Sequence, residues 1–370
     1  MYQNRYIFLL SCFMLMPLGL HASDTDKLSM TPMGRVLMDA GQYIGAPDTL
    51  RGGVHFWDVR LGFKGKFDNS WFFKVDIGFA GNKVKAKDVF VEYTCGKHTV
   101  RVGQFYEPFS MDVLGSTTDM RFPQVAGMAL AFANSRKTGV MYTYGKSRYN
   151  FSLGLFSEAS MAEDQRDLER YSVAGRFVAR PVLTDKEVMA VTVAPSWCKT
   201  GRKLTISSSG VSSWEEVAIT KAEITDARSR FKVGGEFLYL NPKFSFQSEY
   251  MLSSVSRYTG AAYSNMGVYG QLSWIVSGAQ YTYDSASSCV ERPKSRSFEL
   301  VARYDYLDQN DGKAEIHGGK FHDFSLGVNC YLNKFIAAKL SYSVLKPLGD
   351  NPIHCNRAFS MVQLRTQFAF

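Results

Sequence analysis

The 370-residue sequence has little of what marks most exported or membrane-bound chains. Beyond Leu20 it holds no stretch of about 18 consecutive apolar residues, so no α-helix is expected to span a bilayer. Its six cysteines include no C-x-x-C pair, and five remain after the first 22 residues, so a disulfide framework is not indicated. We expect these cysteines to serve as small apolar side chains on strand faces.

Signatures of enzyme chemistry are also missing. There is no G-x-S-x-G, no H-E-x-x-H and no phosphate-binding Gly-rich loop followed by Lys-Ser or Lys-Thr. The six histidines are scattered, and His317 and His322, which flank two glycines, are interpreted as loop or strand-end residues rather than a metal pair. We therefore expect no catalytic residue, no metal and no cofactor.

The first 22 residues differ from the rest and read as a secretory signal peptide. Arg5 provides a positive start, residues 7–20 form an apolar run too short to span a membrane, and residues 20–22 form an acceptable cleavage site. The mature chain is expected to begin near Ser23, which lowers the formal net charge from +9 to +8. In an exported protein this basic balance points to lipopolysaccharide or anionic solutes rather than nucleic acid.

What the mature chain does have is alternation. From Trp57 to Lys64, large apolar residues alternate with charged or small ones, and the pattern returns from Trp71 to Phe79 after the tight turn at Asn69-Ser70. About 16 such segments are predicted, while 198–229 could hold one strand or only a loop. They lie near 33–43, 57–64, 71–79, 84–95, 98–105, 138–145, 149–157, 170–180, 186–197, 230–240, 243–253, 263–277, 297–307, 321–332, 334–345 and 359–370.

Two architectures share this alternation, a soluble β-sandwich and an outer-membrane β-barrel. Many segments reach the roughly 9–11 residues of a tilted membrane-spanning strand, and the chain ends in an alternating strand that closes on Phe370. Aromatic residues at the segment ends fit the two interfacial girdles of a barrel. They are Trp57, Phe67, Trp71, Tyr93, Tyr142, Tyr144, Tyr149, Tyr239 and Tyr250. We therefore predict an all-β fold, a transmembrane antiparallel β-barrel of about 16 strands. Residues 23–370 would form it, exported through the periplasm to the Gram-negative outer membrane.

If the large apolar side chains face lipid, the alternating positions face the lumen. The charged residues at those positions are nine basic and eight acidic, with the basic ones concentrated in the first strands, and cations near a constriction favour anions. The alternative is that they are ordinary solvated charges paired with one another. They are Arg35, Asp39, Asp58, Arg60, Lys64, Lys66, Lys74, Asp76, Asp88, Glu92, Arg101, Arg176, Arg180, Glu249, Glu299, Arg303 and Asp305.

Several motifs together resemble the phosphate-selective porin O and P family of Gram-negative outer membranes. They are GRVLMD at 34–39, RLGFKGK at 60–66, VEY at 91–93, VGQFYEPFS at 102–110, FELVARYDYLD at 298–308 and DFSLGVNCYLN at 323–333. The resemblance covers both ends of the mature chain and is weak over 181–230. It implies a homotrimer of 16-stranded barrels that conducts anions passively, with the loop at 107–137 folded into the lumen as a constriction.

The family's phosphate-selective members line their pores with arginines and a lysine cluster, partly on that loop, and here the sequence departs from them. Between Glu107 and Ser135 the single basic residue is Arg121, against three acidic residues. A diffusion porin with a modest anion preference, for phosphate or other oxyanions, is therefore the predicted function. The alternative is a non-conducting barrel with a surface-binding or structural role. The candidate anion-contacting residues are Arg35, Arg60, Lys64, Lys74, Arg101, Arg121 and Arg136.

Overall fold

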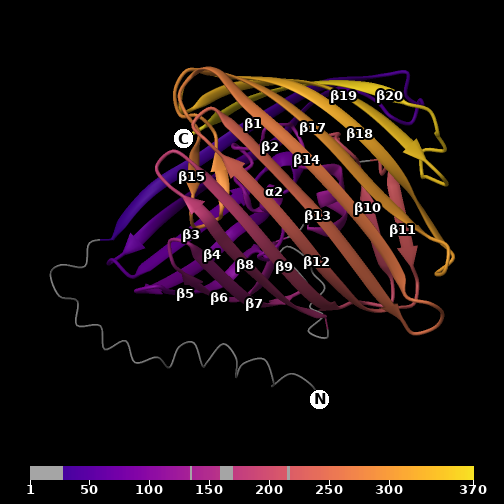
Figure 1. Ribbon diagram of the computed structural model, residues 1–370, viewed down its shortest axis with the longest axis horizontal. Helices are drawn as coiled ribbons and strands as arrows, with labels where there is room; N and C mark the ends of the chain where they lie inside the picture. Colours follow the sequence, from indigo (N-terminus) through magenta and orange to yellow (C-terminus); the bar gives the residue numbers. More distant parts are fainter. Residues whose placement is uncertain (1–27, 134–135, 159–169, 215–216) are drawn as a thin grey trace.

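The structure, a computed structural model, describes residues 28–133, 136–158, 170–214 and 217–370, and these form a closed antiparallel barrel of sixteen strands (Figure 1). Each barrel strand pairs with the next one along the chain, and β1 pairs with β20 to close the sheet. The predicted fold class is thus confirmed. The barrel strands are β1 (Ser29–Ile44), β2 (Gly53–Phe67), β3 (Trp71–Gly78), β4 (Lys85–Cys95), β5 (His98–Tyr106), β6 (Arg136–Gly145), β7 (Tyr149–Ser157), β8 (Tyr171–Leu183), β9 (Val188–Lys199), β12 (Ala227–Leu240), β13 (Phe244–Arg257), β14 (Tyr263–Gly278), β17 (Ser297–Asp311), β18 (Ile316–Tyr331), β19 (Ile336–Leu348) and β20 (Phe359–Ala369).

Alternation explains why these segments close into a barrel. Their apolar side chains stand exposed on the outer surface, as Leu155, Val193 and Leu340 do, while charged side chains between them are buried inside. A bilayer offers no hydrogen-bond partner to a free strand edge, so β segments span it only when the sheet closes. The predicted girdle residues Trp71, Tyr93, Tyr142, Tyr149 and Tyr250 are exposed on this surface.

Trp57 was predicted for the same girdle, and for this residue the prediction was wrong. A register shift places Leu37 opposite Asp58 and Met38 opposite Phe56, so Trp57 is the extra residue of a β-bulge. Its ring lies 4.1 Å from the guanidinium carbon of the fully buried Arg365, and Phe56 is exposed instead. The bulge breaks the alternation that the prediction had assumed to run unbroken.

The barrel also departs from strict alternation at a row of phenylalanines on the lumen side. Phe72, Phe90, Phe105 and Phe156 come from four different strands, and neighbouring ring centres lie 6.0, 6.0 and 5.5 Å apart. Gly103 has a positive φ of 138°, and a Cβ there would collide with Phe90, so the ring needs this glycine beside it. The rule that aromatic residues face lipid therefore fails on this part of the wall.

Connections at one end of the barrel are short turns, with one exception, and those at the other end are longer. The predicted loop between β5 and β6 carries two short helices, α2 (Met111–Leu114) and α3 (Gly127–Phe132), and it folds into the lumen. The undecided 198–229 region extends two barrel strands, β9 and β12, and adds a hairpin, β10 (Leu204–Ser208) and β11 (Thr220–Ile224). The described part of this region, 198–214 and 217–229, contains no further barrel strand.

The exception at the short-turn end is the connection between β14 and β17. It contains a second hairpin, β15 (Thr282–Asp284) and β16 (Cys289–Glu291), which was not among the predicted segments. Figure 1 shows β10 and β11 at one end of the barrel and β15 at the other. The lumen is therefore entered by polypeptide from both ends.

The signal peptide, the absence of membrane-spanning helices and the role of the cysteines were also predicted from the sequence. The signal peptide predicted at 1–22 lies outside the described residues. Among the residues that the structure describes, no helix has the length and apolarity to cross a membrane. The five cysteines of the described chain are all free thiols.

Candidate pore-lining site

The inward loop is fixed to the wall where it leaves β5. The buried carboxylate of Glu107 accepts a hydrogen bond from Lys137 at 3.0 Å and another from Lys232 at 2.5 Å. Lys232 also donates to the carbonyl oxygen of Phe132 at 2.9 Å. Although burial favours the neutral acid, Lys232 and Lys137 lower the pKa of Glu107 to about 2. One carboxylate thus joins both ends of the loop to β12.

Further along, α2 is held by an acid on β13. Glu249 accepts hydrogen bonds from the Ser110 hydroxyl at 3.1 Å and from the Asp112 backbone N–H at 2.9 Å. The hydroxyl of Tyr269 donates to the same oxygen at 2.8 Å. Ser110 has a positive φ of 69°, a conformation that a non-glycine residue adopts only when its surroundings enforce it.

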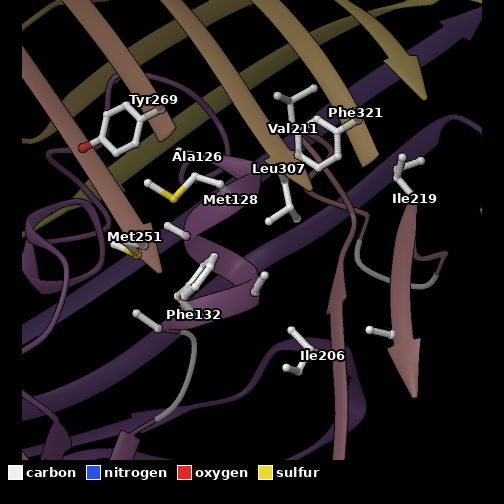
Figure 2. Close-up of a cluster of buried hydrophobic side chains, with 14 of the residues drawn as sticks. Ala126, Met128, Phe132, Ile206, Val211, Ile219, Met251, Tyr269, Leu307 and Phe321 are labelled. Atoms are coloured by element: carbon white, nitrogen blue, oxygen red, sulfur yellow. The ribbon is translucent and has the colours of Figure 1, made fainter. Parts of the chain in front are cut away.

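The second helix, α3, is capped by the wall and then packed. Asp305 on β17 accepts the backbone N–H groups of Gly127 and Met128, which have no partner within the helix. Figure 2 shows Met128 and Phe132 among Met251, Tyr269 and Leu307 of the wall and Ile206 of the β10–β11 hairpin. A Cβ at Gly127 would lie 2.8 Å from the Cα of Gly210, so the two segments meet at backbone contact. An apolar core therefore fills this part of the lumen.

The middle of the loop is held by side chains that donate to its carbonyl oxygens. Lys339 donates to Thr118 and Met120, Arg303 donates to Gln124 at 3.0 Å, and Asn329 donates to Arg121 at 3.0 Å. Apart from that of Lys137 on β6, the contacts of the loop with barrel strands described so far come from β12, β13, β14, β17, β18 and β19. We call these strands, with β20, the packed wall. Its buried charges satisfy the backbone groups that a loop inside a barrel would otherwise leave unpaired.

The opposite side of the lumen, β1 to β6, is here called the open wall. It lines a cavity of about 790 Å³ that reaches α2, the β15–β16 hairpin and the end of β20. Cavities of about 540 and 260 Å³ share Tyr106 and Leu114 with it, so the three adjoin one another. The largest is lined by eight basic and four acidic side chains. They are Arg35, Arg60, Lys64, Lys74, Arg101, Arg292, Lys294 and Lys334, with Asp76, Asp88, Asp119 and Glu291.

Five of the seven predicted anion-contacting residues line this large cavity: Arg35, Arg60, Lys64, Lys74 and Arg101. A sixth, Arg136, lines the adjoining 260 Å³ cavity. The structure thus brings these six together on neighbouring strands. Whether they contact anions remains a prediction.

Most of these cations are paired with carboxylates of the same wall. Arg60 contacts Asp58 at 2.7 Å and Asp76 at 3.0 Å, and Arg35 lies 3.0 Å from Asp58. Asp88 lies between two cations, with Lys74 at 2.7 Å and Arg136 at 2.6 Å. Two of the six cations are more exposed to the lumen than the others. They are Arg101, 31% exposed and paired with Glu92, and Lys64, which is exposed.

Arg121 lies apart from the other six. It is buried between the loop and the β15–β16 hairpin, 3.3 Å from Glu299, and it donates to the carbonyl oxygen of Val290 at 3.1 Å. Nearby, burial raises the pKa of Asp119, and the positive charges of Arg292 and Arg121 partly oppose that rise. Arg121 therefore joins the two inward segments and does not line the large cavity.

Sequence reasoning missed Arg292, Lys294 and Lys334, which face the same cavity from the short-turn end. Strand parity could not find them, because they lie in connections. The one available signal was the length of the connection between the segments predicted at 263–277 and 297–307. It carries Glu291-Arg292-Pro293-Lys294 and is far longer than a tight turn.

No group of three or more histidine, cysteine, aspartate or glutamate side chains in the described chain is arranged to hold a metal ion. His317 and His354 both line a separate cavity of about 410 Å³ near β11, while His322 contacts Tyr304 at 2.8 Å on the exposed side of β18.

Comparisons with known proteins agree with this geometry. A family model described as phosphate-selective porin O and P matches residues 33–370. An uncharacterized protein of Caulobacter vibrioides is 24% identical over 351 residues, covering 88% of this chain and 70% of the relative. Among solved structures, the trimer form of OmpT from Vibrio cholerae superposes with a TM-score of 0.65 at 11% identity, covering 93% of this chain and all of that one. An anion-selective porin from Comamonas acidovorans superposes with a TM-score of 0.63 at 15% identity and the same coverage. At these identities the two structures show a shared fold.

Proposed function

The chain belongs to the phosphate-selective porin O and P family, and on that premise we propose that it forms a modestly anion-preferring diffusion channel. The family and the barrel support an outer-membrane channel, and a channel rather than an enzyme is the proposed role. The anion preference is a further part of the proposal. It rests on one observation, the excess of basic over acidic side chains around the 790 Å³ cavity of the open wall.

Charge in a narrow pore is weakly screened, so this excess lowers the barrier for entering anions. The cavity is bounded by α2 and the hairpin, so a solute that crosses the barrel passes the open wall. Phosphate is one candidate among the oxyanions, yet the loop supplies a single cation, Arg121, and that side chain is occupied by Glu299.

The protein is further proposed to act as a homotrimer, exported by its signal peptide and surrounded by outer-membrane lipid and lipopolysaccharide. One neighbour by fold is described as a trimer, and the exposed apolar side chains of the barrel suit both lipid and subunit contacts. Small anionic solutes are the expected cargo.

The test is the reversal potential of the purified full chain in a planar bilayer under a potassium chloride gradient. We expect chloride to permeate better than potassium, and Lys64→Gln to lower that ratio about twofold, because it removes an exposed cation of the open wall. Lys221→Gln, which removes an equal charge from the β10–β11 hairpin, serves as the matched control and is expected to leave the ratio unchanged. Potassium selectivity in the wild type would refute the anion preference.

One observation favours a second candidate, the non-conducting barrel with a surface-binding or structural role. The inward loop and the β10–β11 and β15–β16 hairpins fill the packed side of the lumen from both ends. Liposome swelling in small sugars separates the two candidates, because a sealed barrel produces no swelling.

A further inference from the structure

The open wall carries aromatic rings beside cations, and this arrangement bears on which solutes the proposed channel prefers to carry. Two adjacent cross-strand rows cross β2, β3, β4 and β5 on the lumen side. The first row is Lys64, Lys74, Phe90 and Gly103, and the second is Lys66, Phe72, Glu92 and Arg101. Residues directly opposite in such rows have Cβ atoms about 5 Å apart, so their side chains interact.

The two rings of these rows, Phe72 and Phe90, lie beside a third ring, Phe105 of β5. Phe72 lies 6.0 Å from Phe90, and Phe90 lies 6.0 Å from Phe105, measured between ring centres. All three line the 790 Å³ cavity, and Phe72 is the least buried of them. Phe90 and Phe105 are buried in a cluster with Phe156, and Phe72 packs against that cluster only in part, so Phe72 is the ring that offers most surface to the cavity.

The cations lie against these rings. The guanidinium carbon of Arg101 lies 4.4 Å from the centre of the Phe90 ring and 5.3 Å from that of Phe105. Lys64 and Lys74 stand directly opposite each other, an arrangement of like charges that destabilises a sheet unless an anion lies nearby. Asp88 neutralises Lys74 at 2.7 Å, and within the described ranges no carboxylate lies within 4 Å of the Lys64 amine.

We propose that this part of the open wall binds organic anions whose charged group is attached to an aromatic ring, in preference to inorganic anions. The carboxylate or sulfonate of such a solute lies between Lys64 and Lys74, and its ring packs on Phe72 and the accessible edge of Phe90. Inorganic phosphate gains the charge contact but nothing from the rings. The inference rests on the proposed function, because it names the solute class of that same cavity.

The test compares benzenesulfonate with methanesulfonate, which carry the same charged group with and without a ring. We measure the concentration of each that halves the chloride current through the full chain in a planar bilayer, and we measure binding to the detergent-solubilised protein by calorimetry. Benzenesulfonate is expected to act at a concentration about tenfold lower. Phe72→Leu is expected to weaken benzenesulfonate about fivefold and to leave methanesulfonate unchanged, since a ring contact of this kind accounts for a factor of that order.

Two further variants make the result decisive. Lys64→Gln is expected to weaken both sulfonates equally, because it removes charge and no ring. Phe156→Leu is the matched control, since Phe156 ends the same row of rings, 5.5 Å from Phe105, but does not line the cavity. Each variant is first checked by gel electrophoresis for the heat-resistant band that marks the folded wild type. If Phe72→Leu lacks this band, the inference is tested by comparing the two sulfonates on the wild type and on Lys64→Gln.

Failure of this inference differs from failure of the proposed function. Equal block by both sulfonates in an anion-selective channel overturns the inference and leaves the channel standing. If the protein does not conduct but calorimetry shows that it binds benzenesulfonate and not methanesulfonate, the inference is supported and the proposed channel function is overturned. Absence of both binding and conductance overturns both.

Discussion

The open wall and the packed wall of this barrel both carry rows of buried charge, and they use it differently. On the packed wall, Lys232, Arg303 and Lys339 donate to carbonyl oxygens of the inward loop, and Asp305 and Glu249 accept its N–H groups. On the open wall, the cations pair with carboxylates of their own strands and border a large cavity.

The difference teaches that lumen charge alone does not indicate selectivity. A cation engaged with the backbone of a loop maintains the shape of the pore. A cation that faces open space acts on the solute. Substitutions on the two walls should therefore separate into effects on stability and effects on selectivity.

The largest effect is expected for Glu107→Ala, which removes the carboxylate that fixes the inward loop to Lys232 of the packed wall. The change leaves Lys232 buried without its carboxylate and Lys137 with Glu158 alone, which costs about 3–5 kcal/mol in the free energy of unfolding. Urea unfolding of the barrel in lipid vesicles measures it. A variant as stable as the wild type would show that this carboxylate does not anchor the loop.

Acid should reproduce part of that loss in the wild type. The folded pKa of Glu107, about 2, lies below its ordinary 4.5, so its contribution to stability is fully present above pH 4.5 and is lost as the pH falls toward 2. Unfolding free energies measured across that range should decline more steeply for the wild type than for Glu107→Gln. Parallel curves would assign the acid sensitivity to other carboxyl groups.

A smaller effect is expected for Arg121→Ala, where the two inward segments meet. The change removes the ion pair with Glu299 and the hydrogen bond to Val290, at a cost of about 1–3 kcal/mol, and it loosens the β15–β16 hairpin. We expect higher single-channel conductance with the anion-to-cation ratio unchanged. Arg121→Lys, which keeps the charge but loses the planar geometry, is the control. A shift in ion selectivity without a change in conductance would instead place Arg121 in contact with solute.

The smallest effect on stability is expected for Glu92→Ala on the open wall. Its partner Arg101 is 31% exposed, so the pair contributes less than about 1 kcal/mol. The unfolding curve should barely move, while loss of a lumen carboxylate should raise the chloride preference slightly in reversal-potential measurements. A loss of stability equal to that of Glu107→Ala would remove the distinction between the walls.

Part of the candidate site could be predicted from the alternation of apolar and polar residues along the strands. Parity selected Arg35, Arg60, Lys64, Lys74 and Arg101 as lumen residues, and the structure places all five around one cavity. Parity could not place residues outside the strands. Arg292, Lys294 and Lys334 lie in connections, and Arg121 lies on a loop whose path depends on partners more than a hundred residues away.

The sequence by itself determined the closed sixteen-stranded barrel, because a period of two sets which face of each strand is apolar and a bilayer tolerates no open edge. Tertiary structure alone decided which lumen charges stay available. Many of the partners lie on the inward loop and the hairpins, and contacts such as that between Glu107 and Lys232 join positions that no local pattern relates. The bulge at Trp57 belongs to the same category, because the side of the sheet that this residue faces depends on the register of β1 and β2.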